Sequence, residues 1–203
     1  MSVLVTGGAG YIGSHTCVAL IEKGFNVVVC DNLCNSERNM VEAVVELTGV
    51  ALSFYKVDIC DRENLDAVFK SQAESGDAID SVIHFAALKS VGESLKKPNL
   101  YHNNNVGGTE VLLEVMKAND VEKIVFSSSC TVYGQPKIIP VDEGAPFLPA
   151  ESPYGKTKQD CEKLISESGV KATLLRYFNP VGAHPSALIG ELPKGVPNNL
   201  VPF

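Results

Sequence analysis

A tyrosine and a lysine four residues apart, Tyr154 and Lys158, are the pair best suited to acid–base chemistry in this sequence. On a helix, residues i and i+4 share one face. A phenol with a pKa of about 10 is a poor base at neutral pH, but a neighbouring ammonium stabilises the phenolate and lowers that pKa. The same spacing also occurs as a plain surface pair. With the glycine motif described next, it predicts a functional tyrosine whose phenolate is stabilised by the lysine.

The most informative motif is the glycine-rich stretch TGGAGYIG at residues 6–13. It contains GxGxxG from Gly8 and GxxGxxG from Gly7, and it lies between a predicted strand and a predicted helix. Glycines allow a tight turn and let the backbone approach a pyrophosphate, which the free N–H groups of the helix N-terminus bind. The alternative is an ordinary glycine turn with Asp31 as a cap. We expect a dinucleotide site.

Asp31 indicates which dinucleotide is bound. It ends the second predicted strand, where a carboxylate can accept hydrogen bonds from the ribose hydroxyls. The same carboxylate repels a 2′-phosphate, and the next basic residue is Arg38. The sequence therefore favours NAD over NADP.

Apolar, β-branched runs alternate along the chain with helical stretches. Strands are predicted at Val3–Thr6, Val27–Asp31, Ser53–Ile59, Ser81–Ala87, Lys123–Ser129 and Thr173–Asn179, and helices at Tyr11–Lys23, Glu37–Leu47, Arg62–Ser75, Pro98–Ala118 and Tyr154–Ser168. Most of these strands are continuously apolar, which is typical of parallel strands buried on both faces. The alternation predicts an α/β fold, a doubly wound parallel (Rossmann) sheet with helices on both faces.

A run of serines, Ser127–Ser129, closes the fifth predicted strand. Side chains at the carboxyl ends of such strands face the ligand crevice. One hydroxyl could therefore bond a substrate oxygen beside Tyr154; the alternative is a polar strand end that caps a turn. The neighbouring Cys130 is interpreted as a structural thiol.

Composition excludes several other classes of protein. The net charge is −7, from 17 basic and 24 acidic residues, and the longest basic cluster is Lys96-Lys97, so we expect no nucleic-acid partner. No apolar run approaches the roughly 20 residues of a membrane span. No secretory signal is evident, which predicts a cytoplasmic protein with free cysteine thiols. The four histidines show no metal-ligand spacing, so no metal is expected.

Together these motifs resemble the extended short-chain dehydrogenase/reductase family, and within it the epimerases that interconvert UDP-galactose and UDP-glucose. The resemblance covers the whole chain. It rests on TGGAGYIGSHT (6–16), DNLCNS (31–36), HFAALKSVGES (84–94), NNVGGT (104–109), FSSSCTVYG (126–134), SPYGK (152–156), RYFNPVGAHPS (176–186) and PNNLVPF (197–203). It implies a seven-stranded Rossmann domain that carries NAD.

The resemblance also implies a set of site residues. The implied cofactor-binding residues are Gly7, Gly10, Tyr11, Ile12, Gly13, Asp31, Asn32, Leu33, Cys34, Asn35, Ser36, Asp58, Ile59, Phe85, Ala86, Ala87, Leu88, Lys89, Asn104, Ser129, Tyr154, Lys158 and Phe178. The implied catalytic residues are Tyr154, Lys158 and Ser129, and the implied substrate-binding residues are Ser129, Tyr154, Asn179 and Asn199.

The implied reaction is redox-neutral. As a phenolate, Tyr154 takes the proton of the sugar 4-hydroxyl while the C4 hydride passes to NAD. The 4-keto sugar turns over in the pocket, and hydride and proton return to it. NAD stays bound throughout.

The expected domain organisation follows from the resemblance and from composition. Residues 1–179 are expected to form the NAD-binding domain. Residues 180–203, which hold five of the eleven prolines, are expected to be a linker or the start of a smaller substrate-binding domain that is largely absent from this chain. Relatives form homodimers through helices that correspond to about 98–118 and 154–168, so a homodimer is expected.

Two alternative functions were considered. A nucleotide-sugar 4,6-dehydratase needs an Asp-Glu pair directly after the serine of the fifth strand, where this chain has Cys130-Thr131. An NAD-binding module without turnover is the other alternative, and it has no need for the Ser129, Tyr154 and Lys158 set.

The first prediction concerns cofactor choice. Replacing the carboxylate by Asp31→Ala should weaken NAD binding and narrow the difference in affinity between NAD and NADP, because the repulsive charge is removed. Titration of the full-length protein with each cofactor measures both affinities. Equal affinities in the unmutated protein would contradict the assignment.

Overall fold

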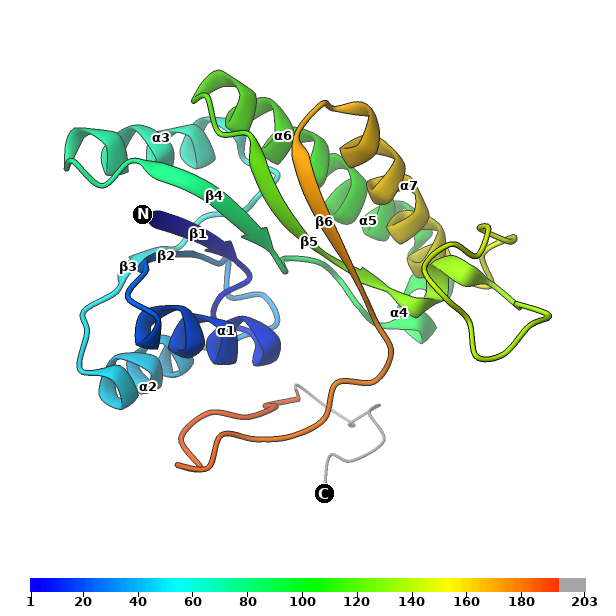
Figure 1. Cartoon of the computed structure of the whole chain (residues 1–203), viewed down its shortest axis with the longest axis horizontal. Coiled ribbons are helices and arrows are strands. Elements are labelled where there is room, and N and C mark those ends of the chain that lie inside the picture. The colour runs from blue at the N-terminus through cyan, green and yellow to red at the C-terminus, as the bar shows by residue number, and fades with distance from the viewer. Residues whose placement is uncertain (194–203) are drawn as a thin grey trace.

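The computed structural model describes residues 1–193. A single sheet of six parallel strands runs in the order β3-β2-β1-β4-β5-β6 (Figure 1). The strands are β1 (Ser2–Thr6), β2 (Asn26–Cys30), β3 (Ser53–Tyr55), β4 (Ile79–His84), β5 (Lys123–Ser129) and β6 (Lys171–Tyr177). The predicted doubly wound α/β fold is confirmed.

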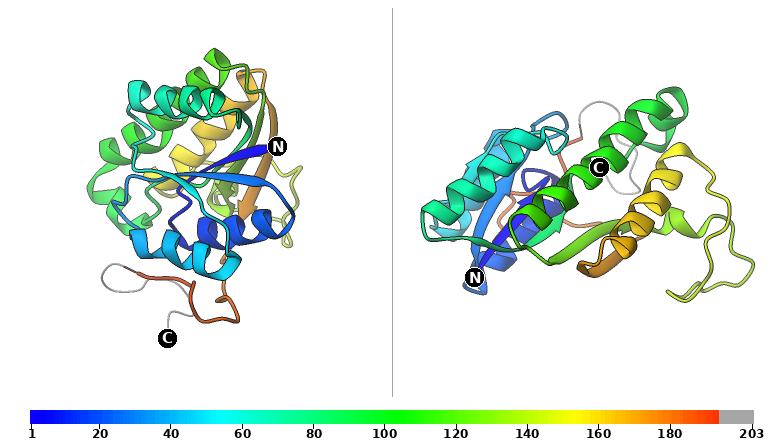
Figure 2. Two further views of the ribbon diagram at one scale, coloured as in Figure 1. Left: turned by 90° about the vertical axis from the view of Figure 1, so that its left-hand side faces the viewer. Right: turned by 90° about the horizontal axis from the view of Figure 1, so that it is seen from above.

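Helices lie on both faces of the sheet. They are α1 (Tyr11–Glu22), α2 (Arg38–Thr48), α3 (Arg62–Glu74), α4 (Val91–Lys96), α5 (Pro98–Tyr101), α6 (Gly108–Ala118) and α7 (Pro153–Glu167), with a π-helix η1 (His102–Gly107) and a 3₁₀ turn η2 (Cys130–Tyr133). The two views of Figure 2 show α1 and α2 on one face and α3, α6 and α7 on the other.

Strand alternation divides the core in two. In β1, Val3 and Val5 pack with α1 and α2, whereas Leu4 between them packs with α3, α6 and α7. Successive side chains of a strand point to opposite faces, so a strand covered on both sides must be apolar at every position. The five residues of β1 are all buried, which confirms the interpretation of its continuous apolar run.

The helical cover is incomplete on one face. Within residues 1–193, α1 and α2 lie over β1–β3, and beside α1 a hollow of about 340 Å³ opens over β4–β6, lined in part by Ile83, Val125 and Thr173. On the same face of β6, Leu175 is 37% exposed. This part of the sheet is thus covered by helices on only one side.

Three element predictions were wrong in detail. β3 ends at Tyr55 and not at Ile59, because Asp58 bends the chain and accepts a hydrogen bond from the Cys60 N–H. The predicted helix 98–118 is helical throughout, as α5, η1 and α6 in succession, but the short helix α4 before it, which Ser90 caps, was not predicted. The described residues form six strands, whereas the resemblance implied seven.

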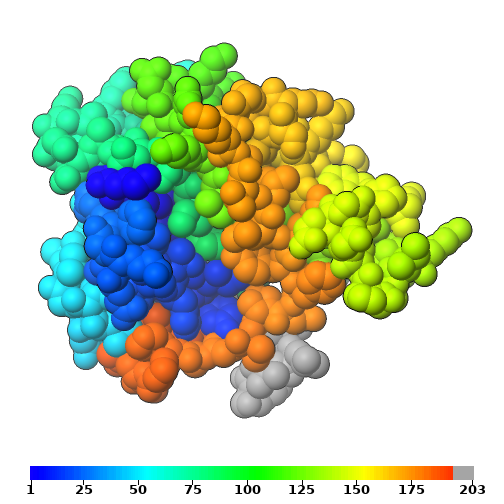
Figure 3. Space-filling model, in the orientation of Figure 1, coloured from blue at the N-terminus to red at the C-terminus, as the bar shows by residue number. Residues whose placement is uncertain are grey.

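The segment that follows β6 has no helix or strand up to Pro193. It packs along α1: Ile189 is 2% exposed within the α1–α2 core, and the Tyr11 hydroxyl donates to the Gly182 carbonyl. Figure 3 shows this segment, in orange and red, against the blue N-terminal part of the chain. The six cysteines form no disulfide within residues 1–193, and no helix in that range is long and apolar enough to cross a bilayer.

A buried histidine joins β1, β4 and α6. His84 is 1% exposed, and its Nδ1 and Nε2 lie 2.7 and 3.2 Å from the hydroxyl oxygens of Thr6 and Thr109. Burial, aided by the charge of Lys158, lowers the pKa of His84 to about 3. The histidine is therefore neutral in the folded protein at pH 7.

This burial predicts an acid-dependent loss of stability. Below the unfolded pKa of about 6.5 the unfolded chain binds a proton that the folded chain excludes down to about 3, so the free energy of unfolding falls as pH falls through this window. His84→Gln should make that slope shallower, by up to about 1.4 kcal/mol per pH unit. Urea unfolding between pH 7 and 4 measures it. Exposed His102→Gln is the control, and an equal slope in both variants would refute the prediction.

Candidate active site

The candidate site lies at the carboxyl ends of the central strands. Strand order reverses between β1 and β4, because the chain passes from β1 outward to β3 and then returns to the other side of β1. Ligands of such sheets bind in the crevice at this switch point. There the turn between β1 and α1 packs against the loop after β4, and Asn105 connects that loop to Thr157 in the first part of α7.

The β1–α1 turn is built for glycine. Gly7 has φ +70°, and a Cβ there would lie 2.6 Å from the Ala86 backbone nitrogen. A Cβ on Gly13 would lie 2.3 Å from the Gly7 carbonyl oxygen. At the N-terminus of α1, Gly10 provides no side-chain cap, so free N–H groups remain there for an anion. Tyr11 and Ile12 follow, both partly buried.

Asp31 connects this turn to the next loop. Its carboxylate is 8% exposed and accepts hydrogen bonds from Ala9 N (3.1 Å), Leu33 N (2.9 Å) and Ser36 Oγ (2.7 Å). A carboxylate has about four acceptor positions, so one remains for a ribose hydroxyl. In the same loop, Cys34 and Asn35 are exposed.

The loop after β3 lies beside the Asp31–Ser36 loop. Asn32 Nδ2 donates to Asp58 Oδ2 at 2.9 Å, which joins the two segments. The Ile59 side chain is 5% exposed and fills the space where a Cβ on Gly108 would stand. Ile59 thus packs against α6, so only its backbone is free to face a ligand.

The loop after β4 holds the predicted residues Phe85, Ala86, Ala87, Leu88 and Lys89. Asn105 of η1 fixes it: Asn105 Oδ1 accepts from Leu88 N (2.8 Å), and Asn105 Nδ2 donates to Leu88 O (2.9 Å) and to Thr157 Oγ1 (3.1 Å). Asn105 is 2% exposed and was not predicted; its neighbour Asn104, which was predicted, donates to it. The asparagine run at 103–105 was the available signal.

The Lys89 side chain forms an ion pair with a residue outside its own loop. Its ammonium lies 3.1 Å from Glu191 Oε1, and its side chain is 68% exposed. This ion pair joins the loop after β4 to the segment that follows β6.

The three predicted catalytic residues lie together. Ser129, at the end of β5, forms a hydrogen bond with Tyr154 that lowers the pKa of the phenol. Lys158 Nζ lies 5.9 Å from the centre of the Tyr154 ring and donates to Ser127 O at 2.7 Å. Helix α7 begins at Ser152–Pro153: the Ser152 hydroxyl accepts from Gly155 N, which fixes the first turn and so the place of Tyr154.

The protonation of this pair differs from the sequence expectation. Burial raises the pKa of Tyr154 above its ordinary value, and the Ser129 hydrogen bond only partly offsets this. Burial also lowers the pKa of Lys158 to about 8. The lysine points at a backbone carbonyl, and its charge does not produce the lowered phenol pKa that the i, i+4 spacing predicted.

The predicted residues after β6 are not enclosed. Phe178 is 61% exposed, and Asn179 is exposed as well. Asn199 and the PNNLVPF stretch lie outside the described residues. Within residues 1–193 no cluster of three potential metal ligands occurs.

Residues 3–198 match the NAD dependent epimerase/dehydratase family. The chain belongs to this family. Its glycine turn, Asp31 and the Ser129–Tyr154–Lys158 group are therefore parts of a family domain.

Similar sequences are named UDP-glucose 4-epimerase. The enzyme of Yersinia pestis is 51% identical over 208 residues, which is 100% of this chain and 60% of the relative. That of Drosophila melanogaster is 52% identical, over 100% of this chain and 59% of the relative. The chain thus spans about 60% of the length of these relatives.

Solved structures agree. UDP-glucose 4-epimerase from Bifidobacterium longum, in complex with NAD+ and UDP, has a TM-score of 0.92 and 45% identity over 98% of this chain and 60% of that chain. The enzyme from Stenotrophomonas maltophila, with bound NAD and formylated UDP-arabinopyranose, has a TM-score of 0.93 and 51% identity, over 98% of this chain and 59% of that chain.

The glycine turn yields a prediction on cofactor affinity. Gly13→Ala should weaken dinucleotide binding by at least about tenfold, or 1.4 kcal/mol, because its Cβ would force the Gly7 carbonyl out of the turn. Gly92→Ala in α4, where a Cβ meets nothing within 4 Å, is the matched control. Titration with NAD measures both, and equal affinities would contradict the role of the turn.

Proposed function

We propose that this protein interconverts UDP-galactose and UDP-glucose through transient oxidation at C4 of the sugar, with NAD as a permanently bound cofactor. The observation that carries the proposal is the Ser129–Tyr154–Lys158 group, in a chain that also has a glycine turn fit for a pyrophosphate. The chain is 51% identical to the UDP-glucose 4-epimerase of Yersinia pestis.

The residues present fit NAD. The turn at Gly7–Gly13 has no room for side chains, and the N-terminus of α1 is uncapped. Asp31 keeps an acceptor for the ribose, and the loop 85–89 is held rigidly by Asn105. When bound there, NAD would supply the hydride acceptor for C4 of the sugar.

The proton is handled by the protein's own side chains. Tyr154 accepts the proton of the 4-hydroxyl and later returns it. The Ser129 hydroxyl, at the end of β5, donates a hydrogen bond to the same sugar oxygen and orients it. Lys158 provides a buried positive charge near the phenol, which favours the phenolate when it forms.

The pKa values imply that the site is activated by its cofactor. Tyr154 has a raised pKa in the chain alone, so it stays protonated at pH 7 until further positive charge arrives. The cationic nicotinamide of oxidised NAD would supply that charge if it were bound beside Tyr154. The phenolate is thus favoured only when the hydride acceptor is in place.

An NAD-binding module without turnover is the second candidate, because the chain spans only about 60% of its relatives. Four expectations stay predictions. They are the domain boundary at residue 179, the contacts of Asn179 and Asn199 with the UDP portion of the substrate, the homodimer, and the cytoplasmic location.

The decisive experiment removes the base. In the full-length protein, Tyr154→Phe should lower kcat for conversion of UDP-galactose to UDP-glucose by about 10²–10⁴-fold, the usual cost of losing a general base, and leave NAD affinity unchanged. Tyr55→Phe is the control, because the Tyr55 hydroxyl bonds Ser71 and Gln72 on α3 and no residue of the proposed site. Bound NAD without turnover in the unmutated protein would favour the inert module.

A further inference from the structure

A buried ion pair outside the predicted site joins β6 to α7. Arg176 Nη2 lies 2.8 Å from Glu162 Oε2, and Arg176 Nε donates to Glu162 Oε1 at 3.0 Å. The two side chains are only 16% and 3% exposed. This two-pronged geometry is the strongest arrangement of such a pair. Neither residue has a role in the proposed reaction.

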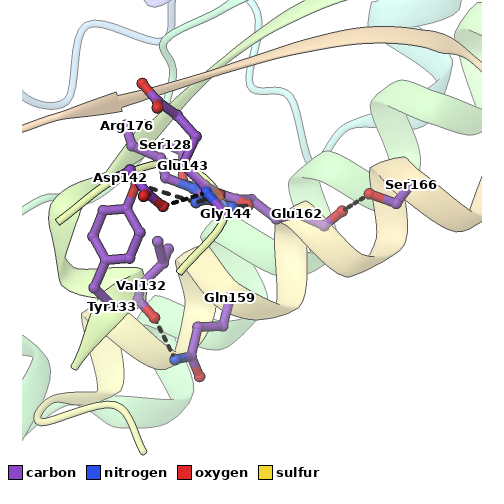
Figure 4. A network of polar contacts seen from close by, with 10 residues as sticks. All are labelled: Ser128, Val132, Tyr133, Asp142, Glu143, Gly144, Gln159, Glu162, Ser166 and Arg176. Atoms are coloured by element: carbon purple, nitrogen blue, oxygen red, sulfur yellow. Dashed lines mark hydrogen bonds and ion pairs between the residues drawn. The ribbon is translucent and has the colours of Figure 1, made fainter. Parts of the chain in front are cut away.

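The pair has further partners on three segments (Figure 4). The Ser128 hydroxyl donates to Glu162 Oε1, and Arg176 Nη1 donates to the Tyr133 hydroxyl (3.1 Å) and the Glu143 carbonyl (3.0 Å). The guanidinium also lies 4.9 Å from the centre of the Tyr133 ring. The hydrogen bonds with Glu162 are the main cause that raises the pKa of Arg176.

These contacts surround the two residues that are proposed to handle the proton. Ser128 directly precedes Ser129 on β5, and Tyr133 ends η2, the turn that Ser129 caps. Glu162 lies on α7, which carries Tyr154 and Lys158. The contacts therefore connect the strand that presents Ser129 to the helix that presents Tyr154.

Stability alone does not account for such a pair. Removing two charges from water costs about as much as their attraction returns, and well-packed apolar residues are often as stable. The charged pair adds directional hydrogen bonds, and each of these bonds fixes the position of one segment relative to α7 and β6. A second link, from Gln159 Nε2 to Val132 O (2.9 Å) and Leu148 O (2.8 Å), keeps η2 near α7 if one contact is lost.

We propose that Glu162 and Arg176 are positioning residues: through Ser128 and Tyr133 they hold the end of β5, and with it Ser129, in place beside Tyr154 of α7. This inference rests on the proposed function. Loosening the contact should let Ser129 move away from the phenol and leave the glycine turn between β1 and α1 unchanged, because none of these contacts involves that turn.

The consequence is measurable on Tyr154 itself. The groups that face its phenol are Ser129 and Cys130 from β5 and η2, and Lys158 and Cys161 from α7. Among these, Ser129 lowers the pKa of Tyr154 by its hydrogen bond. When Ser129 moves away, burial remains and the phenol should titrate at higher pH.

The experiment uses the full-length protein with NAD bound. Ser128→Ala removes the link to Glu162, and Ser128→Thr restores a hydroxyl. Arg176→Lys keeps the charge but cannot bond Glu162, Tyr133 and Glu143 at once. Lys171→Met, which removes an exposed ion pair with Glu122 at the other end of β6, is the matched control. Ultraviolet absorbance of tyrosinate is titrated in each variant, and the titration of the same variant carrying Tyr154→Phe is subtracted.

We expect Ser128→Ala and Arg176→Lys to move the Tyr154 titration to higher pH and to lower kcat by about tenfold, within the hundredfold that a 1 Å misplacement can cost. KM and NAD affinity should stay unchanged, Ser128→Thr should recover both readouts, and Lys171→Met should behave as the unmutated protein. Thermal unfolding checks that each variant is folded.

Two results overturn the inference: an unshifted Tyr154 titration in folded Ser128→Ala and Arg176→Lys, or a loss that Ser128→Thr does not recover. Failure of the proposed function gives a different result, since the unmutated protein would then lack turnover of UDP-galactose. The titration shift is read without substrate, so it tests the positioning role in that case too.

Discussion

Helix α7 buries two charged side chains, Lys158 and Glu162, against β5. The arrangement of the proposed site depends on the hydrogen bonds and the ion pair that these two side chains form. Each is less than 5% exposed. Lys158 is held by the Ser127 carbonyl and Glu162 by the Ser128 hydroxyl and Arg176. An unpaired buried charge would be very costly, so α7 can sit on β5 in only one register. That register places Tyr154 beside Ser129.

The same burial sets the protonation of the site. Removing Lys158 from water lowers its pKa to about 8, and removing Tyr154 from water raises its pKa. Each shift favours the neutral form, so the protein alone does not create a phenolate. In the proposed reaction this is an advantage, because the phenolate would form only where a cationic cofactor is bound.

The proposed cofactor site depends on close approach of the backbone at the glycine turn. The proposed catalytic group depends instead on buried charges. Gly7 and Gly13 let the turn fold against Ala86 and against itself, and Asp31 ties that turn to the loop 31–36. Asn105 then links the loop after β4 to Thr157 on α7. Cofactor turn, loop and catalytic helix are thereby parts of one hydrogen-bonded framework.

The sequence by itself determined the layered fold, the glycine turn, Asp31 and the Ser129–Tyr154–Lys158 group. Continuous apolar runs and short motifs with fixed spacing are local properties, and they survive folding unchanged. Only the tertiary structure decided that Lys158 points at Ser127, that burial raises the pKa of Tyr154, that Asn105 bonds both the loop after β4 and Thr157, and that Arg176 pairs with Glu162. These depend on contacts between residues distant in the chain and on exclusion of water, neither of which a local pattern records.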